Sequence, residues 1–224
     1  MNEETSSLLR KNGIILGSIL SLLLLLVVTT NSFALFTSQT DRVTYTFRQK
    51  EIVAGTLISG PDFNKLLEKV SGKNGGVKIS KIIFETNVNP DLKNVFYKED
   101  VGIDKDSKII LWVDTRNGND YIVHVSTRAH KIDANSNSSS MFSNLDVSEI
   151  ILTGLDVTKA KNMSYMFANL KNLESLDLSG FVIGDVDVNN MFINSTNIKE
   201  VVVKDEGIST KLSSLNNTIK FSVK

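Results

Sequence analysis

The 224-residue sequence predicts an α+β protein that begins with a signal or anchor helix, continues with a small α+β lead-in region and ends in a short leucine-rich-repeat solenoid of the α/β type. An uncharged apolar stretch near the N-terminus, helix-like and strand-like patterns after it, and a repeat of 25 or 26 residues lead to this prediction. The expected divisions are 1–36 (signal peptide or transmembrane anchor), 37–135 (lead-in region), 136–204 (a solenoid of about three units) and 205–224 (C-terminal cap).

Composition excludes several classes of protein. Lys and Arg together number 25, as do Asp and Glu, so the chain has no net charge and lacks the basic surplus typical of nucleic-acid binding. The absence of cysteine excludes a disulfide scaffold, thiolate catalysis and Cys-ligated metals. His124 and His130 are the two histidines, which leaves little imidazole chemistry. We therefore expect a non-enzymatic protein with no cofactor and no nucleic-acid partner.

The apolar stretch covers residues 13–28, GIILGSILSLLLLLVV, and contains no charged residue. Arg10 and Lys11 precede it and form a basic flank. Such a segment suits either a long signal-peptide core or a membrane span. In both cases the basic flank stays in the cytoplasm, so we expect the rest of the chain outside it.

The end of this segment leaves two outcomes open. Ser32 and Ala34 are small residues at the spacing of a signal-peptidase site, which makes cleavage after Ala34 one outcome and secretion its result. Without cleavage, residues 12–35 would hold the protein in the cell membrane with its C-terminal region outside the cell.

Periodicity predicts the elements of the lead-in region. Alternating apolar residues over 43–47 indicate a strand, and apolar residues at helical spacing over 63–70 indicate a helix that Asp62 caps and Gly72 ends. Further strands are expected at 78–84, 108–113 and 121–125, with a hairpin at Asn117-Gly118 between the last two.

Met-Phe pairs mark the repeat and recur every 25 residues, with an apolar triplet of the form L-x-x-L-x-L after each pair. This pattern is the signature of leucine-rich repeats, in which each unit buries one face against its neighbours. We expect Met163, Met166 and Phe167 to line one helical turn. The expected repeat core is Met141, Phe142, Ile150, Leu152, Met163, Met166, Phe167, Leu173, Leu176, Leu178, Phe181, Met191, Phe192, Ile198, Val201 and Val203.

Two runs carry a resemblance to a family. Residues 173–181, LESLDLSGF, and residues 162–167, NMSYMF, resemble the BspA-like leucine-rich-repeat surface proteins. The third unit departs from that pattern at 182–185 and at Val188. The resemblance implies a bacterial cell-surface or secreted protein, and adhesion or host-protein binding is a role of some members.

A shorter resemblance covers residues 34–57. The runs ALFTSQT and AGTL are similar to the start of TasA/camelysin-like exported proteins, although Ser38 and Gln39 stand where an acidic residue is usual. This resemblance implies an export route.

No catalytic or metal-ligating motif emerges. The acidic pairs Asp104/Asp106 and Asp185/Asp187 lack the Gly and Glu that an EF-hand loop needs at its sixth and twelfth positions. His124 lies within an alternating strand pattern and is expected to be structural. We therefore predict no catalytic residue and no metal site.

Surface positions on the repeat strands are the remaining candidates for function. If the strands line the inner face of a solenoid, a partner would contact Glu149, Ile151, Glu174, Asp177, Lys199 and Val202. We expect this face to bind an extracellular protein or glycan, as an adhesin does. A structural subunit of the cell surface or biofilm matrix is the alternative, and a solvated face without a partner is the other interpretation.

Overall fold

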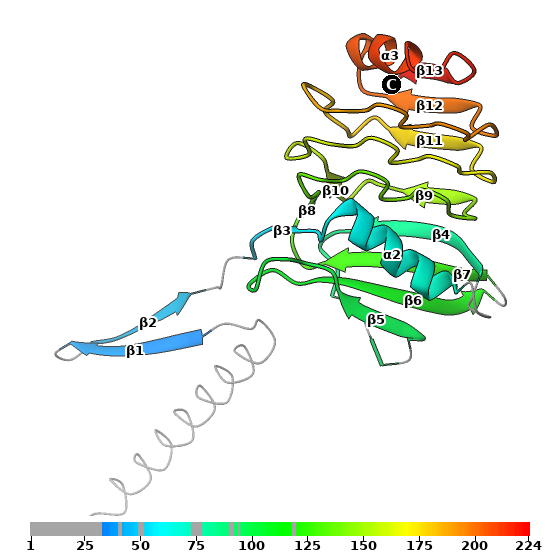
Figure 1. Cartoon of the computed structure of the whole chain (residues 1–224). Helices are drawn as coiled ribbons and strands as arrows, with labels where there is room; N and C mark the ends of the chain where they lie inside the picture. The colour runs from blue at the N-terminus through cyan, green and yellow to red at the C-terminus, as the bar shows by residue number, and fades with distance from the viewer. Residues whose placement is uncertain are drawn as a thin grey trace, which may run out of the picture. The chain divides into compact units, whose positions relative to one another are not determined.

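The structure is a computed structural model that describes residues 33–39, 42–48, 52–72, 78–89, 92–93, 95–117 and 120–224 (Figure 1). The chain divides into two units, Met1–Glu51 and Ile52–Lys224. The predicted division at residues 36, 135 and 204 stays a prediction. Among the described residues, no helix has the length and apolarity needed to span a membrane.

The described part of the first unit is a hairpin. Strands β1 (Phe33–Gln39) and β2 (Arg42–Arg48) pair antiparallel, which confirms the strand predicted over 43–47. The apolar stretch 13–28 lies outside the described residues. Ala34, the candidate cleavage position, lies in β1, so residues 33–36 are not helical as the anchor prediction required.

A five-stranded sheet forms the base of the second unit. Its order is β5 (Tyr97–Asp100), β6 (Ile109–Asn117), β7 (Asp120–Thr127), β4 (Lys78–Glu85) and β9 (Glu149–Ile151). The three strands predicted in the lead-in region are confirmed, and β6 and β7 form the predicted antiparallel hairpin. Strand β4 pairs parallel with both β7 and β9 and thereby joins the lead-in region to the repeats.

Helix α2 (Gly60–Ser71) covers one face of this sheet (Figure 1). It confirms the predicted helix but not its cap, because the Ser59 hydroxyl, rather than Asp62, accepts a hydrogen bond from the first turn. Gly60 lets the helix approach the repeats closely, since a Cβ there would lie 2.4 Å from the Ser139 carbonyl oxygen. Phe63 packs against Phe84 at a ring distance of 6.1 Å.

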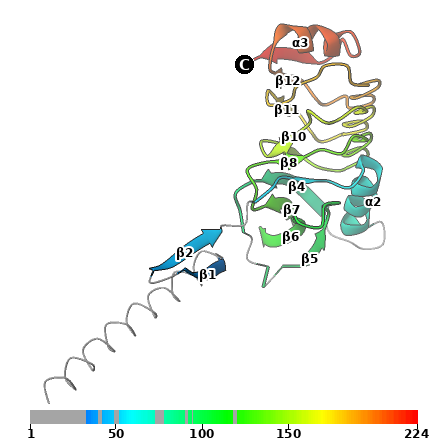
Figure 2. The ribbon, with the colours of Figure 1, turned by 90° about the vertical axis from the view of Figure 1, so that its left-hand side faces the viewer.

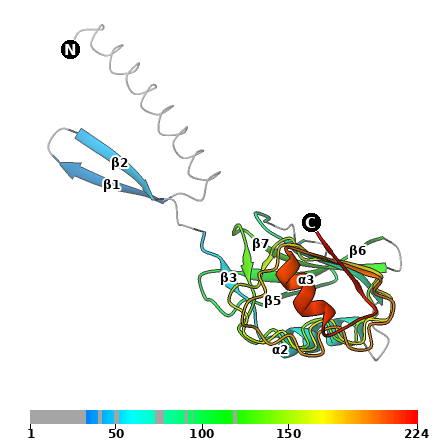
Figure 3. The same ribbon diagram turned by 90° about the horizontal axis from the view of Figure 1, so that it is seen from above.

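Short parallel strands stack above the base (Figure 2). On one side, β11 (Ser175–Leu178), β12 (Glu200–Val203) and β13 (Lys220–Val223) form a three-stranded sheet. On another, β3 (Gly55–Thr56), β8 (Ile132–Asp133) and β10 (Leu155–Asp156) form a second one. Helix α3 (Glu206–Ser213) lies over the end of the stack (Figure 3).

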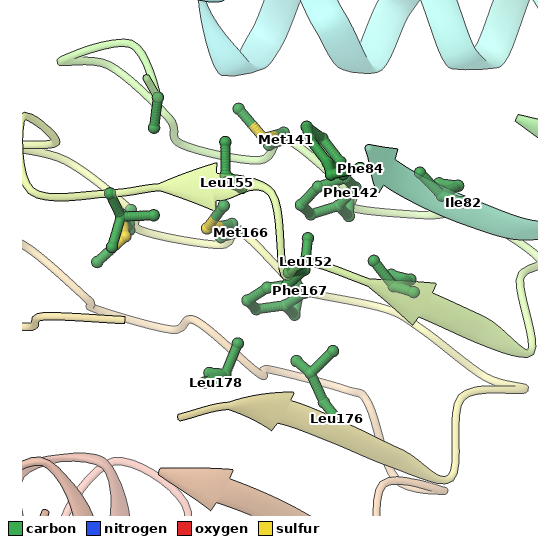
Figure 4. Close-up of a cluster of buried hydrophobic side chains, with 14 of the residues drawn as sticks. Ile82, Phe84, Met141, Phe142, Leu152, Leu155, Met166, Phe167, Leu176 and Leu178 are labelled. Carbon is green, nitrogen blue, oxygen red and sulfur yellow. The ribbon is translucent and has the colours of Figure 1, made fainter. Parts of the chain in front are cut away.

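Aromatic rings link successive 25-residue units in the interior (Figure 4). Phe142 stacks on Phe167 at 5.4 Å, and Phe167 stacks on Phe192 at 5.7 Å, with rings 12° and 10° from parallel. All residues expected in the repeat core are buried, the least so at 6% exposure. This row of rings extends to Phe84 of β4, whose ring lies 6.0 Å from that of Phe142.

The predicted fold class is wrong. The described chain is mostly β-sheet, and its two helices, α2 and α3, contain 12 and 8 residues. No described helix lies between β9 and β11 or between β11 and β12, and α3 connects only β12 to β13, so the helix-led α+β architecture with an α/β-type solenoid is not formed. No described helix corresponds to the predicted signal or anchor helix.

Left-handed residues explain why the repeat segments are not helical. Asn144, Asn169 and Asn194 have φ angles of 59°, 59° and 61°. Four residues before each, a second residue is also left-handed, namely Ser140, Tyr165 and Asn190. A right-handed helix cannot continue through such residues. The helical turn predicted at Met163, Met166 and Phe167 is therefore a series of turns, although these side chains are buried.

Side chains from the two helices satisfy backbone carbonyls at the two ends of the stack. In α2, the buried Asn64 amide donates to the carbonyls of Met141 and Ser143, at 3.4 and 2.9 Å. In α3, the Lys211 ammonium donates to the carbonyls of Gly184 and Val186, at 2.7 and 3.2 Å. Each side chain supplies donors where a further repeat would otherwise have supplied backbone N–H groups.

The Asn64 contact can be tested by substitution. We expect Asn64→Leu to lower the free energy of unfolding by about 1–3 kcal/mol, because two carbonyls lose their donor. Urea unfolding followed by the fluorescence of Trp112 measures the change. Lys65→Leu on the exposed side of α2 is the matched control and should shift stability by less than about 0.5 kcal/mol. Equal stability of the two variants would contradict this role for Asn64.

Candidate functional site

The sheet face opposite α2 is the candidate site, and we call it the front face. Along β4, Ile82 and Phe84 point to the core, so Lys81, Ile83 and Glu85 lie on the front face. Strand register places residues of the other strands beside them, and β11 lies next to β9 (Figure 1). The front face comprises Ile110, Trp112, Asp114, Ile122, His124, Ser126, Lys81, Ile83, Glu85, Glu149, Ile151, Ser175, Asp177, Glu200, Val202, Lys220 and Ser222.

The structure places four of the six predicted partner-facing positions on this face. Glu149 and Asp177 are exposed, while Ile151 and Val202 are half-buried. Glu174 and Lys199 precede their strands and form an exposed ion pair at 3.2 Å beside the face. The four front-face positions lie on β9, β11 and β12.

Charged side chains on the front face are mostly paired within the chain. Lys81 contacts Glu149 at 2.8 Å, and Lys220 contacts Glu200 at 3.1 Å. Hydrogen bonds from Lys220 and Ser222 lower the pKa of Glu200. Exposed pairs of this kind add little stability, and their alternating signs leave the face without one dominant charge.

A cluster around Trp112 occupies the β6–β7–β4 part of the front face. The indole stacks on the His124 imidazole at 3.9 Å with rings 7° from parallel, and both residues are 7% exposed. The indole N–H donates to Ser126 Oγ at 3.0 Å, and Ser126 donates to Glu85 Oε2 at 2.8 Å. His124 Nδ1 lies 3.2 Å from Glu85 Oε1, and Nε2 lies 3.9 Å from Asp114 Oδ2.

The arrangement of this cluster is that of a structural network rather than a nucleophilic site. The Ser126 hydroxyl donates to Glu85, whereas an activated serine would donate to the imidazole. Ser126 is 1% exposed, so a substrate could not reach its oxygen. The sequence analysis identified His124 but missed its partners. A signal was present, because Trp112 and His124 each alternate with the buried apolar residues of their strands and therefore lie on the other face of the sheet.

One carboxylate of each acidic pair considered for calcium accepts a backbone hydrogen bond. Asp104 Oδ2 accepts from the Thr56 N–H at 2.6 Å, and Asp187 Oδ1 accepts from the Asn189 N–H at 2.9 Å. Within the described residues, no group of three or more His, Asp or Glu side chains could hold a metal ion.

A second charged cluster, missed in the sequence, joins β8 to β10. Asp133 and Asp156 are direct neighbours in the parallel ladder, and Asp133 is 2% exposed. Lys131 bridges them at 2.8 and 2.7 Å, and Lys159 contacts Asp133 at 2.6 Å. Two lysines thus neutralise two carboxylates that would otherwise repel each other.

The ionisation of this cluster is shifted accordingly. Burial alone would raise the pKa of Asp156, but hydrogen bonds from Lys131 and Thr158 outweigh it and lower the pKa to about 2. The pKa of Asp133 is also lowered, because its contacts with Lys131 and Lys159 outweigh the effect of burial. Hydrogen bonds to Asp133 and Asp156 raise the pKa of Lys131.

Comparison of the sequence with protein-family models, with curated proteins and with solved structures gives no match. The likeness to BspA-like surface proteins and to TasA/camelysin-like starts therefore stays a resemblance.

The charged cluster predicts a pH dependence. A lowered pKa in the folded state means that ionised Asp156 stabilises the fold above pH about 4, and that this stabilisation is lost as the pH falls towards 2. We expect Asp156→Asn to lower the free energy of unfolding at pH 7 by about 1–2 kcal/mol and to lessen its decline between pH 4 and 2. Urea unfolding at each pH measures both effects. Asp185→Asn, at an exposed position, is the control, and identical pH profiles for Asp156→Asn and wild type would refute the expectation.

The stacked pair can be tested through the fluorescence of Trp112, the single tryptophan in the chain. We expect His124→Ala to shift its emission to longer wavelength and to lower the free energy of unfolding by about 1–3 kcal/mol, because the indole loses a stacked neighbour and gains water. His124→Phe should retain most of the wild-type emission, and His130→Ala, at an exposed site, should not change it. An unchanged spectrum for His124→Ala would rule out the stack.

Proposed function

We propose that this chain is a non-enzymatic bacterial cell-surface or secreted protein that binds an extracellular protein or glycan through its front face, in an adhesion-like role. The observation that carries the proposal is the composition of this face. Half-buried Ile83 and Ile151 are neighbours on β4 and β9, and half-buried Val202 lies on β12, where it pairs with the exposed Asp177 of the intervening β11. The exposed members of ion pairs lie along these residues.

The position of the helices supports a binding role for this face. Helix α2 packs on the opposite side of the sheet and α3 lies over the end of the stack, so both described helices leave the front face accessible (Figure 2 and Figure 3). Removal of half-buried isoleucine surface from water would favour association, at about 25 cal/mol per Å². The paired charges around it would select the orientation of the partner.

A non-enzymatic role is consistent with the chemistry of the same face. The buried His124 and Ser126 interact with Glu85 and stabilise the sheet instead of facing a substrate cavity. Export is proposed from the uncharged stretch 13–28 and its basic flank, which leave cleavage after Ala34 and retention in the membrane as the two forms of the protein.

The matrix-subunit alternative has weaker support. A fibre built by stacking repeats end to end would need open backbone groups at both ends of the stack. At the first end, Asn64 of α2 already occupies the carbonyls of Met141 and Ser143. We therefore favour binding over assembly.

A binding experiment with surface variants tests the proposal. Full-length protein is applied to immobilised collagen, fibronectin and laminin and to a glycan array. We expect binding to at least one of these probes and an affinity at least tenfold lower for Ile151→Arg, because a charge would be forced into the apolar part of the interface. Val182→Arg, at an exposed valine outside the strands, is the matched control and should bind as wild type does.

The outcomes separate the candidate functions. Equal loss in both variants, or none in Ile151→Arg, would refute binding through the front face. Failure to bind any probe, together with concentration-dependent assembly in sedimentation, would favour the matrix-subunit alternative.

A further inference from the structure

Three apolar side chains are exposed on the loops where the chain enters the second unit. Ile52, Val53 and Ile103 are 45%, 57% and 57% exposed. Ile52 and Val53 are the first residues of the second unit, and Ile103 belongs to the loop between β5 and β6. We call these three residues the entry patch. Large apolar side chains that gather on one exposed surface are typical of a contact with a protein or a membrane.

Hydrogen bonds join the two loops of the entry patch. The Ser107 hydroxyl donates to the Val53 carbonyl at 2.8 Å, and the Ile103 N–H donates to the Thr56 carbonyl at 2.9 Å. In the opposite direction, the Thr56 N–H donates to Asp104 Oδ2 at 2.6 Å. The entry patch is therefore one surface made by two bonded loops rather than a set of separate exposed residues.

The loop that carries Ile103 has no net charge. Over residues 102–108, Lys105 and Lys108 balance Asp104 and Asp106. An interaction of the entry patch would therefore depend on the removal of apolar surface from water and not on attraction between opposite charges.

The position of the entry patch in the chain indicates a lipid bilayer as its occupant. The uncharged stretch begins at residue 13 and β1 begins at Phe33, so residues 13–32 supply the about 20 residues that a membrane span needs. Phe33 pairs with Arg48 in the hairpin, so the chain returns to the residue that directly follows this stretch. Residues 49–51 are then the whole connection to Ile52. If the protein is retained in the membrane, this short connection tethers the entry patch to the bilayer.

We propose that, in the form retained in the membrane, the entry patch lies at the bilayer surface and inserts the side chains of Ile52, Val53 and Ile103 among the lipid headgroups. Three apolar side chains would bind a bilayer weakly in a free protein, but the tether makes the contact intramolecular and raises the effective concentration of lipid. This inference rests on the membrane-retained form of the proposed function and adds a second lipid contact to it.

Such a contact would orient the second unit on the membrane. The loops of the entry patch lie beside the five-stranded base sheet, and α3 lies at the other end of the stack (Figure 1). Contact at the base would direct the repeats away from the bilayer. The part of the front face on β11, β12 and β13 would then be held at a distance from the lipid, where an extracellular partner can reach it.

A second copy of this chain is a poorer occupant of the entry patch. Stable protein interfaces bury about 1,200–2,000 Å² in total, which is far more than three partly exposed side chains supply. The hairpin of the first unit is the other candidate occupant, and quenching by labelled lipid distinguishes it from the bilayer.

Fluorescence quenching by lipid tests this proposal. The chain has no cysteine, so Lys105→Cys introduces a single site for a bimane label beside the entry patch. Labelled full-length protein is reconstituted in phosphatidylcholine vesicles with and without a lipid that carries a nitroxide on its headgroup. We expect at least twofold quenching by the nitroxide lipid. Adding Ile103→Asp should abolish most of this quenching, and a label at Val182→Cys, an exposed valine of the repeats, should show none.

Two further measurements separate the outcomes. Flotation of the vesicles reports membrane retention, and iodide in the aqueous phase reports whether the label is covered at all. Protein that floats with the vesicles but shows no nitroxide quenching, or equal quenching after Ile103→Asp, would overturn the proposal and leave membrane retention intact. A label that is shielded from iodide but not quenched by the nitroxide lipid would overturn it in favour of the hairpin or a second copy. Protein that does not float would refute membrane retention and this proposal together, whereas binding through the front face is measured independently.

Discussion

The backbone register between units, one residue matched with another 25 positions later, is the constraint on which this structure depends. Hydrogen bonds of the left-handed turns fix that register, and it places Phe142, Phe167 and Phe192 in one stacked row. A shift by one residue would leave buried carbonyls without donors and would move polar side chains into the core. The same requirement explains the contacts at the two ends of the stack. Carbonyl groups that have no further unit beside them need other donors, and Asn64 and Lys211 provide these donors.

This constraint also shapes the surface. The register is continuous from β4 to β9 and from β11 to β13. Side chains that point away from the core therefore line up from strand to strand, and together they form the front face. The ends of the stack and the front face therefore expose different chemical groups. The front face presents side chains, whereas the ends of the stack present backbone groups, some of which bond to Asn64 and Lys211.

Sequence patterns predicted much of the local structure and less of its assembly. The strands, the antiparallel pairing of β6 with β7 and helix α2 follow from periodicity and turn chemistry, which are local. The repeat fold was mistaken because Met163, Met166 and Phe167 have helical spacing, while the left-handed Tyr165 between them gives no signal in its residue type. The partners of Trp112 and of Asp133 were missed because strand order, which brings β4 beside β7 and β8 beside β10, is a tertiary property.

Asparagine at the recurring turn position connects these observations. It is one of the few residues besides glycine that readily adopts a left-handed conformation, and unlike glycine it has an amide that can join a ladder. At Asn144, Asn169 and Asn194 it satisfies the backbone geometry of the turn and also links each unit to the next. Aspartate would meet the conformational requirement but would place three carboxylates in one row. The turn chemistry and the stacking of units therefore favour the same residue at this position of each unit.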